Sequence, residues 1–251
     1  MHRTIGLLGD IPIFPMLGRL TTRVLNLSPE KQNALIEEAR EASVRPFIIG
    51  ITGPGGAGKS TLIGQIISSL IQTSPHERLA VFAFDPVSDK SGGAILGDRA
   101  RLPKHLITDH RVFFRSISGR GQSKGMATLP ILIALSVHAG ASTVIIETVG
   151  SGQDDVAIRK YVDLLVWVLP PFGDVLTFMK SGIAECADIA IVNVHPETEH
   201  LARRTVHALT SALGLGASHV HTVLACAGNT AAGAREALDA IQSIHKMSPA
   251  K

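Results

Sequence analysis

The chain is poor in cysteine and in long apolar runs, and each shortage excludes a class of protein. Its 251 residues include two cysteines, Cys186 and Cys226, too few for a disulfide framework or a zinc motif, so we expect thiols in a reducing compartment. No stretch reaches the roughly 18 uninterrupted apolar residues of a membrane span. The apolar patch over residues 5–8 is short and runs into Asp10 and several prolines, unlike a signal peptide. We therefore expect a cytoplasmic protein without a membrane partner.

Charge is also sparse. Charged residues make up 18% of the chain and the net charge is +3, with no cluster of Lys and Arg that would indicate nucleic-acid binding. Hydrophobic residues make up 45%, which indicates a globular protein with a large core. No shift in composition marks a second domain, so we predict one domain over residues 28–251. Residues 1–27 are predicted to be an irregular lead-in, because Pro12, Pro15 and Gly18 interrupt any regular pattern.

What is present is a phosphate-binding loop over residues 53–61, which we call the P-loop. It matches the pattern G-x-x-x-x-G-K-[ST], follows a β-branched apolar run (47–52) and precedes residues with helical spacing (60–71). Glycines let backbone N–H groups wrap around an anion, and a helix N-terminus adds further donors. Lys59 would reach the β- and γ-phosphates, and the Ser60 hydroxyl would bind Mg²⁺. We therefore predict that a nucleotide is held by Gly55, Gly56, Ala57, Gly58, Lys59, Ser60 and Thr61.

Strands and helices alternate along the rest of the chain. Apolar runs predict strands over residues 79–84, 111–115, 143–147, 164–169, 189–193 and 220–224, and helices over 28–42, 127–139, 174–185, 197–213 and 231–245. Nearly continuous apolar strands are typical of a mostly parallel sheet that is buried on both faces. We therefore predict an α/β P-loop NTPase fold, doubly wound, with helices on both faces of the sheet. Ligands of such sheets bind at the carboxyl ends of the strands.

Three carboxylates lie at or near these strand ends. Glu147 has the position of a Walker B acid, which holds Mg²⁺ or an Mg²⁺-bound water. Asp85 ends another strand and Asp98 lies in a glycine-rich loop, where either could hold the metal's water shell or orient the attacking water. Gly150 suits a switch loop whose backbone N–H meets the γ-phosphate. The predicted catalytic group is Lys59, Asp85, Asp98 and Glu147, and the predicted metal site is Ser60, Asp85, Asp98 and Glu147. Ordinary helix caps and loop acids are the alternative for these carboxylates.

Several blocks, combined with the P-loop, resemble the MeaB/ArgK family of P-loop GTPases, which are chaperones of adenosylcobalamin-dependent acyl-CoA mutases. The blocks span residues 84–86, 91–98, 114–121, 147–153 and 173–183, and the resemblance covers roughly residues 28–245. Ser-Gly-Gly…Leu-Gly-Asp and Glu-Thr-Val-Gly-x-Gly-Gln are its most specific parts. It implies that GTP or GDP binds with Mg²⁺, that hydrolysis is slow, and that a mutase such as methylmalonyl-CoA mutase reads the nucleotide state. It also implies mobile switch segments over residues 151–155 and 172–182.

Three departures from that family bear on specificity and assembly. The family's Asn-Lys-x-Asp is Asn193-Val194-His195-Pro196 here, so Asn193 remains a predicted nucleotide contact while Pro196 replaces the Asp that accepts hydrogen bonds from guanine. A buried guanine edge left unpaired costs about 1–3 kcal/mol. In place of the family's Ser-Ala loop, which contacts the base, this chain has Ala225-Cys226-Ala227-Gly228. The family's C-terminal arm, which mediates its dimer, has no counterpart after His245, so we expect a homodimer only as one possibility.

Guanine is therefore the expected base, and adenine stays open. One alternative function is a degenerate nucleotide-binding partner protein with little turnover or relaxed base specificity, since the guanine motif is altered while the phosphate residues are intact. A second alternative is an enzyme that uses ATP. A small-molecule kinase is a weaker option, because no acceptor pocket can be inferred from the sequence.

A group of histidines makes a transition-metal site an alternative to consider. His219 and His221 are two residues apart at the start of the strand predicted over residues 220–224 and would face the same side. His195, His200 and His207 lie in the adjacent segment. A pair without a cysteine or a third ligand at fixed spacing is weak support for a metal site, so a surface or packing role is favoured.

Overall fold

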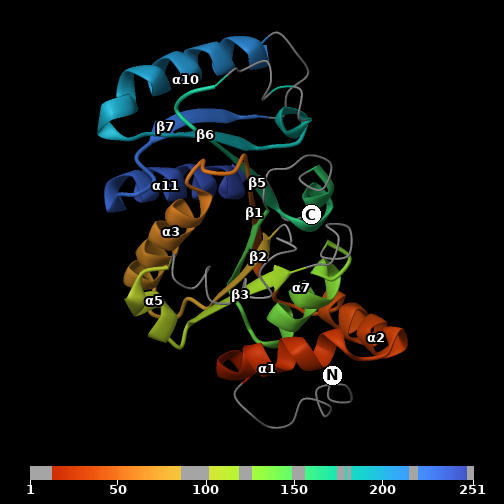
Figure 1. Cartoon of the computed structure of the whole chain (residues 1–251). Helices are drawn as coiled ribbons and strands as arrows, with labels where there is room; N and C mark the ends of the chain where they lie inside the picture. Colours follow the sequence, from red (N-terminus) through yellow and green to blue (C-terminus); the bar gives the residue numbers. More distant parts are fainter. Residues whose placement is uncertain are drawn as a thin grey trace. The chain divides into compact units, whose positions relative to one another are not determined.

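The computed structural model describes residues 13–85, 102–118, 126–148, 156–173, 179, 182–214 and 220–247 (Figure 1), with the backbone alone at residues 13–16, 85, 118 and 247. The chain divides into two compact units. The first comprises residues 1–48 and 74–146, and the second comprises residues 49–73 and 147–251. Among the described helices, none is both long enough and apolar enough to cross a bilayer. The prediction of a single domain over residues 28–251 stays a prediction.

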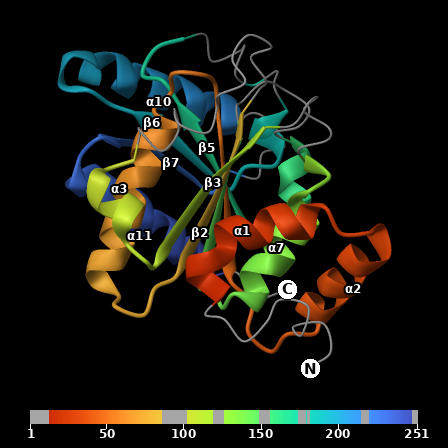
Figure 2. The same ribbon diagram turned by 60° about the horizontal axis from the view of Figure 1, so that its bottom comes forward.

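The first unit combines helices with the strand order β3-β2-β4. Strand β2 pairs in parallel with β3, from Leu79 opposite Val112 to Asp85 opposite Ser118. Helix α7 packs against α2 and α1, and α1 also contacts β3 (Figure 2). The elements of this unit are α1 (Ile13–Leu25), α2 (Pro29–Arg40), β2 (Leu79–Asp85), α5 (Lys104–Thr108), β3 (Val112–Ser118), α7 (Leu129–His138) and β4 (Thr143–Glu147), of which the last residue belongs to the second unit.

Over residues 13–25, helix α1 corrects the prediction that residues 1–27 are an irregular lead-in. Pro15 lies in the first turn of this helix, where a missing N–H is tolerated. Four side chains spaced as one helical stripe are buried against the unit: Leu17, Leu20, Thr21 and Val24. The burial of this stripe outweighs the helix-weakening effect of Gly18. The sequence prediction gave too much weight to isolated proline and glycine residues and too little to the apolar spacing.

The second unit has the strand order β1-β5-β6-β7, and the β1–β5, β5–β6 and β6–β7 pairs are parallel. Helix α11 packs on α3 and β7, while α10 packs on β6 and β7. Figure 1 shows α10 and α11 on opposite sides of β6 and β7. The elements are β1 (Phe47–Thr52, from Ile49 onward), α3 (Lys59–Thr73), η3 (Ile158–Tyr161), β5 (Leu164–Leu169), η4 (Ile183–Glu185), β6 (Ile189–Asn193), η5 (Pro196–Thr198), α10 (Glu199–Gly214), β7 (Thr222–Cys226) and α11 (Ala231–Met247).

The predicted α/β fold with mostly parallel strands is confirmed. Every residue of β5 and β6 is buried, as expected for strands covered on both faces. The predicted strands lie within two or three residues of the observed bounds. The helix predicted over residues 174–185 falls mostly outside the described residues, and its described end forms the 3-10 turn η4.

Candidate functional site

The P-loop joins β1 to α3, and its glycines adopt backbone conformations that other residues rarely reach. Gly53, Gly56 and Gly58 have φ angles of 143°, 78° and 88°. A Cβ at Gly53 would collide with the Val168 carbonyl oxygen, and one at Gly58 with the side-chain amide of Asn193. A Cβ at Gly55 or Gly56 would meet nothing within 4 Å. The base of the loop therefore requires glycine for close packing, while its crest borders open space that an anion can enter.

Lys59, the first residue of α3, has its ammonium group inside the P-loop. Its Nζ donates to the carbonyl oxygens of Gly53 at 2.7 Å and Pro54 at 3.0 Å, and the residue is 7% exposed. These bonds hold the positive charge at the P-loop, where a charge-assisted hydrogen bond to a phosphate oxygen is stronger than a neutral one. The predicted position of Lys59 in a phosphate site fits this geometry.

Ser60 and Glu147 meet although they are far apart in the sequence. The Ser60 hydroxyl donates to Glu147 Oε1 at 2.7 Å. The Thr148 N–H donates to the Ile51 carbonyl oxygen at 3.0 Å, which fixes the chain next to Glu147 against β1. A hydroxyl and a carboxylate beside the P-loop form an oxygen donor set of the kind that Mg²⁺ prefers. The residues present therefore fit a magnesium ion held by Ser60 and, directly or through water, by Glu147.

Asn193 connects the P-loop to the loop that follows β7. Its Nδ2 donates to the Ala57 carbonyl oxygen at 2.9 Å, and its Oδ1 accepts from the Gly228 N–H at 3.0 Å. The side chain is buried, with the residue 4% exposed. Both ends of the amide are thus bonded to backbone groups, so Asn193 acts as a brace between two loops. Its contact with a nucleotide stays a prediction.

The structure brings part of the predicted site together within the second unit. Lys59, Ser60 and Glu147 converge on the P-loop. For Asp85 the structure describes only the backbone, at the end of β2 in the first unit. Asp98 and Gly150 lie outside the described residues. Roles for these three residues therefore stay predictions.

The loop after β7, residues 226–230, overlaps the segment 225–228 in which the family's Ser-Ala pattern is replaced, and it is closely packed. The Cys226 carbonyl oxygen accepts from Val194 N–H at 2.9 Å and Gly228 N–H at 3.0 Å. Thr230 caps α11 through its Oγ1, which accepts from Gly233 N–H at 3.1 Å. A Cβ at Gly233 would collide with the Ala227 backbone. A Thr just before a helical run is the signal that predicts this cap.

Two further candidates for chemistry, the Cys226 thiol and a cluster of metal ligands, find no support in the described part of the chain. Burial, and secondarily the charge of Glu236, raises the pKa of the Cys226 thiol to about 12, so it stays protonated and unreactive at neutral pH. No group of three or more His, Cys, Asp or Glu side chains is placed to hold a metal ion in the described part of the chain. His219 lies outside that part, so the histidine site predicted as an alternative stays untested.

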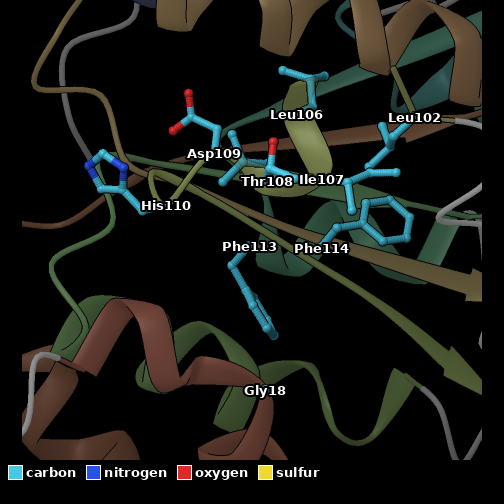
Figure 3. A pocket seen from close by; sticks show the side chains of 10 residues that line it. Gly18, Leu102, Leu106, Ile107, Thr108, Asp109, His110, Phe113 and Phe114 are labelled. Atoms are coloured by element: carbon cyan, nitrogen blue, oxygen red, sulfur yellow. The ribbon is translucent and has the colours of Figure 1, made fainter. Parts of the chain in front are cut away.

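The first unit has a pocket of its own, of about 270 Å³, beside α1, α5 and β3 (Figure 3). A bonded pair lies at its polar end, where the Asp109 carboxylate accepts from Arg111 at 2.7 Å and 3.0 Å. The hydrogen bond from Arg111 lowers the pKa of Asp109, so this carboxylate is ionised and already paired. The pocket is lined by Gly18, Leu102, Leu106, Ile107, Thr108, Asp109, His110, Val112, Phe113 and Phe114.

Sequence comparison relates the chain to a family of GTPases. A family model described as methylmalonyl-CoA mutase-associated GTPase MeaB matches residues 17–249. A candidate GTPase of Pyrococcus abyssi is 40% identical over 183 residues, which is 70% of this chain and 55% of that protein. A fused isobutyryl-CoA mutase of Nocardia farcinica is 37% identical over 165 residues, which is 64% of this chain and 15% of that protein. The chain spans about half the length of the first curated relatives it matches.

Structure comparison supports the same fold. The crystal structure of LAO/AO transport system kinase superimposes with a TM-score of 0.69 over 92% of this chain and 70% of that chain, at 23% sequence identity. At this level of identity the match establishes the P-loop NTPase fold and leaves activity to be argued from the site.

Proposed function

Since the chain belongs to the MeaB family of methylmalonyl-CoA mutase-associated GTPases, we propose that it binds GTP with Mg²⁺ and hydrolyses it to GDP and phosphate. One observation carries this proposal. The Ser60 hydroxyl and the Glu147 carboxylate meet at 2.7 Å beside the P-loop. That places an oxygen donor pair next to the buried Lys59 and the open crest at Gly55 and Gly56.

The proposed roles follow from charge and position. The P-loop N–H groups and the α3 N-terminus bind the phosphates, and Lys59 binds the β- and γ-phosphate oxygens. Ser60 and Glu147 hold Mg²⁺, which when bound neutralises charge on those oxygens. Asp85 and Asp98 are proposed to orient the attacking water or the water shell of the metal, and the Gly150 N–H to meet the γ-phosphate. Catalysis is then positioning and charge stabilisation, without a covalent step on the protein.

The proposed partner is an adenosylcobalamin-dependent acyl-CoA mutase. The family's own description associates it with methylmalonyl-CoA mutase. A segment similar to this chain is also part of a protein described as a fused isobutyryl-CoA mutase. We propose that the mutase distinguishes the GTP and GDP states of this chain, in the cytoplasm. A homodimer is also proposed, with no residue assigned to its interface.

A second candidate function is a nucleotide-binding partner protein with little turnover. The observation that favours it is Pro196, which takes the place of the family's guanine-reading carboxylate. A protein that retained phosphate binding and lost hydrolysis would still present two states to a mutase, apo and nucleotide-bound. Single-turnover hydrolysis separates this candidate from the first.

The test measures Mg²⁺-dependent GTP binding and single-turnover phosphate release in the wild type and in Lys59→Ala, Ser60→Ala and Glu147→Gln. Loss of charge-assisted hydrogen bonds from Lys59 is expected to weaken GTP binding by roughly 10- to 100-fold. Ser60→Ala and Glu147→Gln are expected to reduce Mg²⁺ dependence and phosphate release. Ser68→Ala is the matched control, because it removes a hydroxyl from the same helix that donates to the Gly64 carbonyl oxygen. Binding without phosphate release in the wild type would favour the second candidate.

A further inference from the structure

The loops after β6 and β7 border the region where the base of a P-loop nucleotide would lie. Asn193 ties both loops to the P-loop through its bonds to Ala57 and Gly228. Ligands of parallel sheets bind at the carboxyl ends of strands, and β6 and β7 end at Asn193 and Cys226. A nucleotide with its phosphates in the P-loop therefore places its base against residues 194–198 and 226–230.

The Ala227 N–H is a half-buried donor that the second of these loops can offer to a base. The Ala227 carbonyl oxygen accepts from the Thr230 N–H at 2.8 Å and the Thr230 hydroxyl at 2.9 Å. The Gly228 N–H is bonded to Asn193. For the Ala227 N–H, by contrast, no acceptor is found among the residues that the structure describes, and Ala227 is half-buried. A half-buried N–H is satisfied by an oxo group and opposed by an exocyclic amine, which is itself a donor.

The first loop offers no acceptor at the position of the family's guanine-reading carboxylate. Pro196 is exposed and its side chain is a hydrocarbon ring. The neighbouring polar groups are used within the turn: His195 N–H donates to Thr198 Oγ1 at 3.2 Å, and the Thr198 N–H donates to the His195 carbonyl oxygen at 2.8 Å. The 2-amino group that distinguishes guanine from hypoxanthine thus has no carboxylate to meet at residue 196.

We infer that this site selects 6-oxopurine nucleotides as a class and accepts hypoxanthine as well as guanine. The inference rests on the proposed nucleotide-binding function and goes beyond it in naming which edge of the base is read. The Ala227 N–H reads the 6-oxo group, and Pro196 leaves the 2-amino group unread. Adenine is disfavoured because its 6-amino group places a donor against a donor.

The test is calorimetric titration of the full chain with GDP, IDP and ADP in the presence of Mg²⁺. Diphosphates avoid turnover during the titration. We expect IDP to bind within about threefold of GDP, and ADP to bind about tenfold or more weakly, from the cost of an unpaired buried donor. A GDP affinity at least tenfold above that of IDP would overturn the inference. In that case Glu197, the next carboxylate in the loop, would be replaced by Gln to test whether it reads the 2-amino group. Equal binding of ADP and GDP would also overturn it. Binding of none of the three would instead defeat the proposed function.

A gain-of-contact variant tests the same idea from the other side. Pro196→Asp introduces a carboxylate at the start of η5, a position where Asp is well tolerated. It is expected to raise the ratio of GDP to IDP affinity at least fivefold, because the new carboxylate can accept a charged hydrogen bond from the 2-amino group that only GDP has. Pro196→Asn is the matched control, with a similar size and no charge, and is expected to change the ratio less. An unchanged ratio in a Pro196→Asp protein that still binds IDP would show that residue 196 does not face the 2-amino group and would overturn the inference.

Discussion

Gly58 is one of the residues on which the P-loop conformation depends. Its φ angle is 88°, and a Cβ there would collide with the Asn193 side-chain amide. Gly58→Ala is therefore expected to lower the free energy of unfolding by roughly 2–4 kcal/mol, from backbone strain and a broken buried hydrogen bond. Chemical denaturation measures the change. Gly55→Ala is the control, because its Cβ would meet nothing within 4 Å and should cost less than about 1 kcal/mol. Equal losses in the two variants would contradict this reading of the loop.

Asn193 acts on the phosphate site through the P-loop backbone, so its loss should be felt by ligands that have no base. Asn193→Ala leaves the Ala57 carbonyl oxygen and the Gly228 N–H without their partner. We expect the affinities for GTP and for inorganic tripolyphosphate, both with Mg²⁺, to fall by a similar factor of roughly ten. Asn33→Ala, which removes the exposed amide of a residue in α2, serves as the control. A loss confined to GTP would mean that Asn193 contacts the base instead.

The sequence was a better guide to the candidate residues of this site than to the hydrogen bonds between them. Pattern and spacing predicted roles for Lys59, Ser60 and Glu147, because a P-loop fixes residue types at fixed positions and a strand end fixes the carboxylate. The bond between Ser60 and Glu147 joins two distant segments, and only the folded sheet brings them together. Likewise, nothing in the chain around Asn193 indicates that both ends of its amide bond to backbone groups of other loops. Such tertiary hydrogen bonds have no local signal.

Among the helices, α1 is hydrogen-bonded to one side chain of β3 in addition to its buried apolar stripe. Arg115 donates to the Gly18 carbonyl oxygen at 2.7 Å and to Thr22 Oγ1 at 3.0 Å, and burial lowers its pKa. Arg115→Ala is expected to lower the free energy of unfolding by about 1–3 kcal/mol and to speed amide hydrogen exchange in α1.

The matched control for Arg115 is Arg40→Ala. Arg40 forms an exposed ion pair with Glu37 within α2, a kind of contact worth at most about 1 kcal/mol. Exchange in α1 is therefore expected to stay at the wild-type rate in this control. Unchanged exchange in the Arg115→Ala variant would mean that the apolar stripe alone holds α1 in place.

The elements themselves were predictable to the degree that their apolar residues form unbroken runs. β5 and β6 are buried along their whole length, so continuous apolar runs located them correctly. α1 was missed because Pro15 and Gly18 resemble loop residues, whereas the buried positions 17, 20, 21 and 24 follow the helical period. The short helix α5 spans five residues, too few for a periodic pattern to emerge. Its place is set by packing of Leu106, which is 1% exposed.

For the whole molecule, the site residues that the structure describes with their side chains belong to one unit. The P-loop, Glu147, Asn193 and the loop after β7 all lie in the second unit, which comprises residues 49–73 and 147–251. Nucleotide binding should therefore stabilise a set of contacts that already exists, including the bonds of Lys59, Ser60 and Asn193. A ligand that binds only the folded state raises its stability by mass action.

Thermal unfolding with GDP and Mg²⁺ tests this at the scale of the molecule. At a free GDP concentration a hundredfold above its Kd, the gain is about 2.7 kcal/mol, which corresponds to a rise in Tm of roughly 5–10 °C for a chain of this size. Lys59→Ala should remove most of that rise, because it deletes the buried ammonium group that is proposed to bind the phosphates. The comparison is made between shifts, since the variant's own Tm can differ from that of the wild type. A GDP-induced shift of the same size in the variant would place the nucleotide elsewhere than the P-loop, because binding at the P-loop would depend on Lys59.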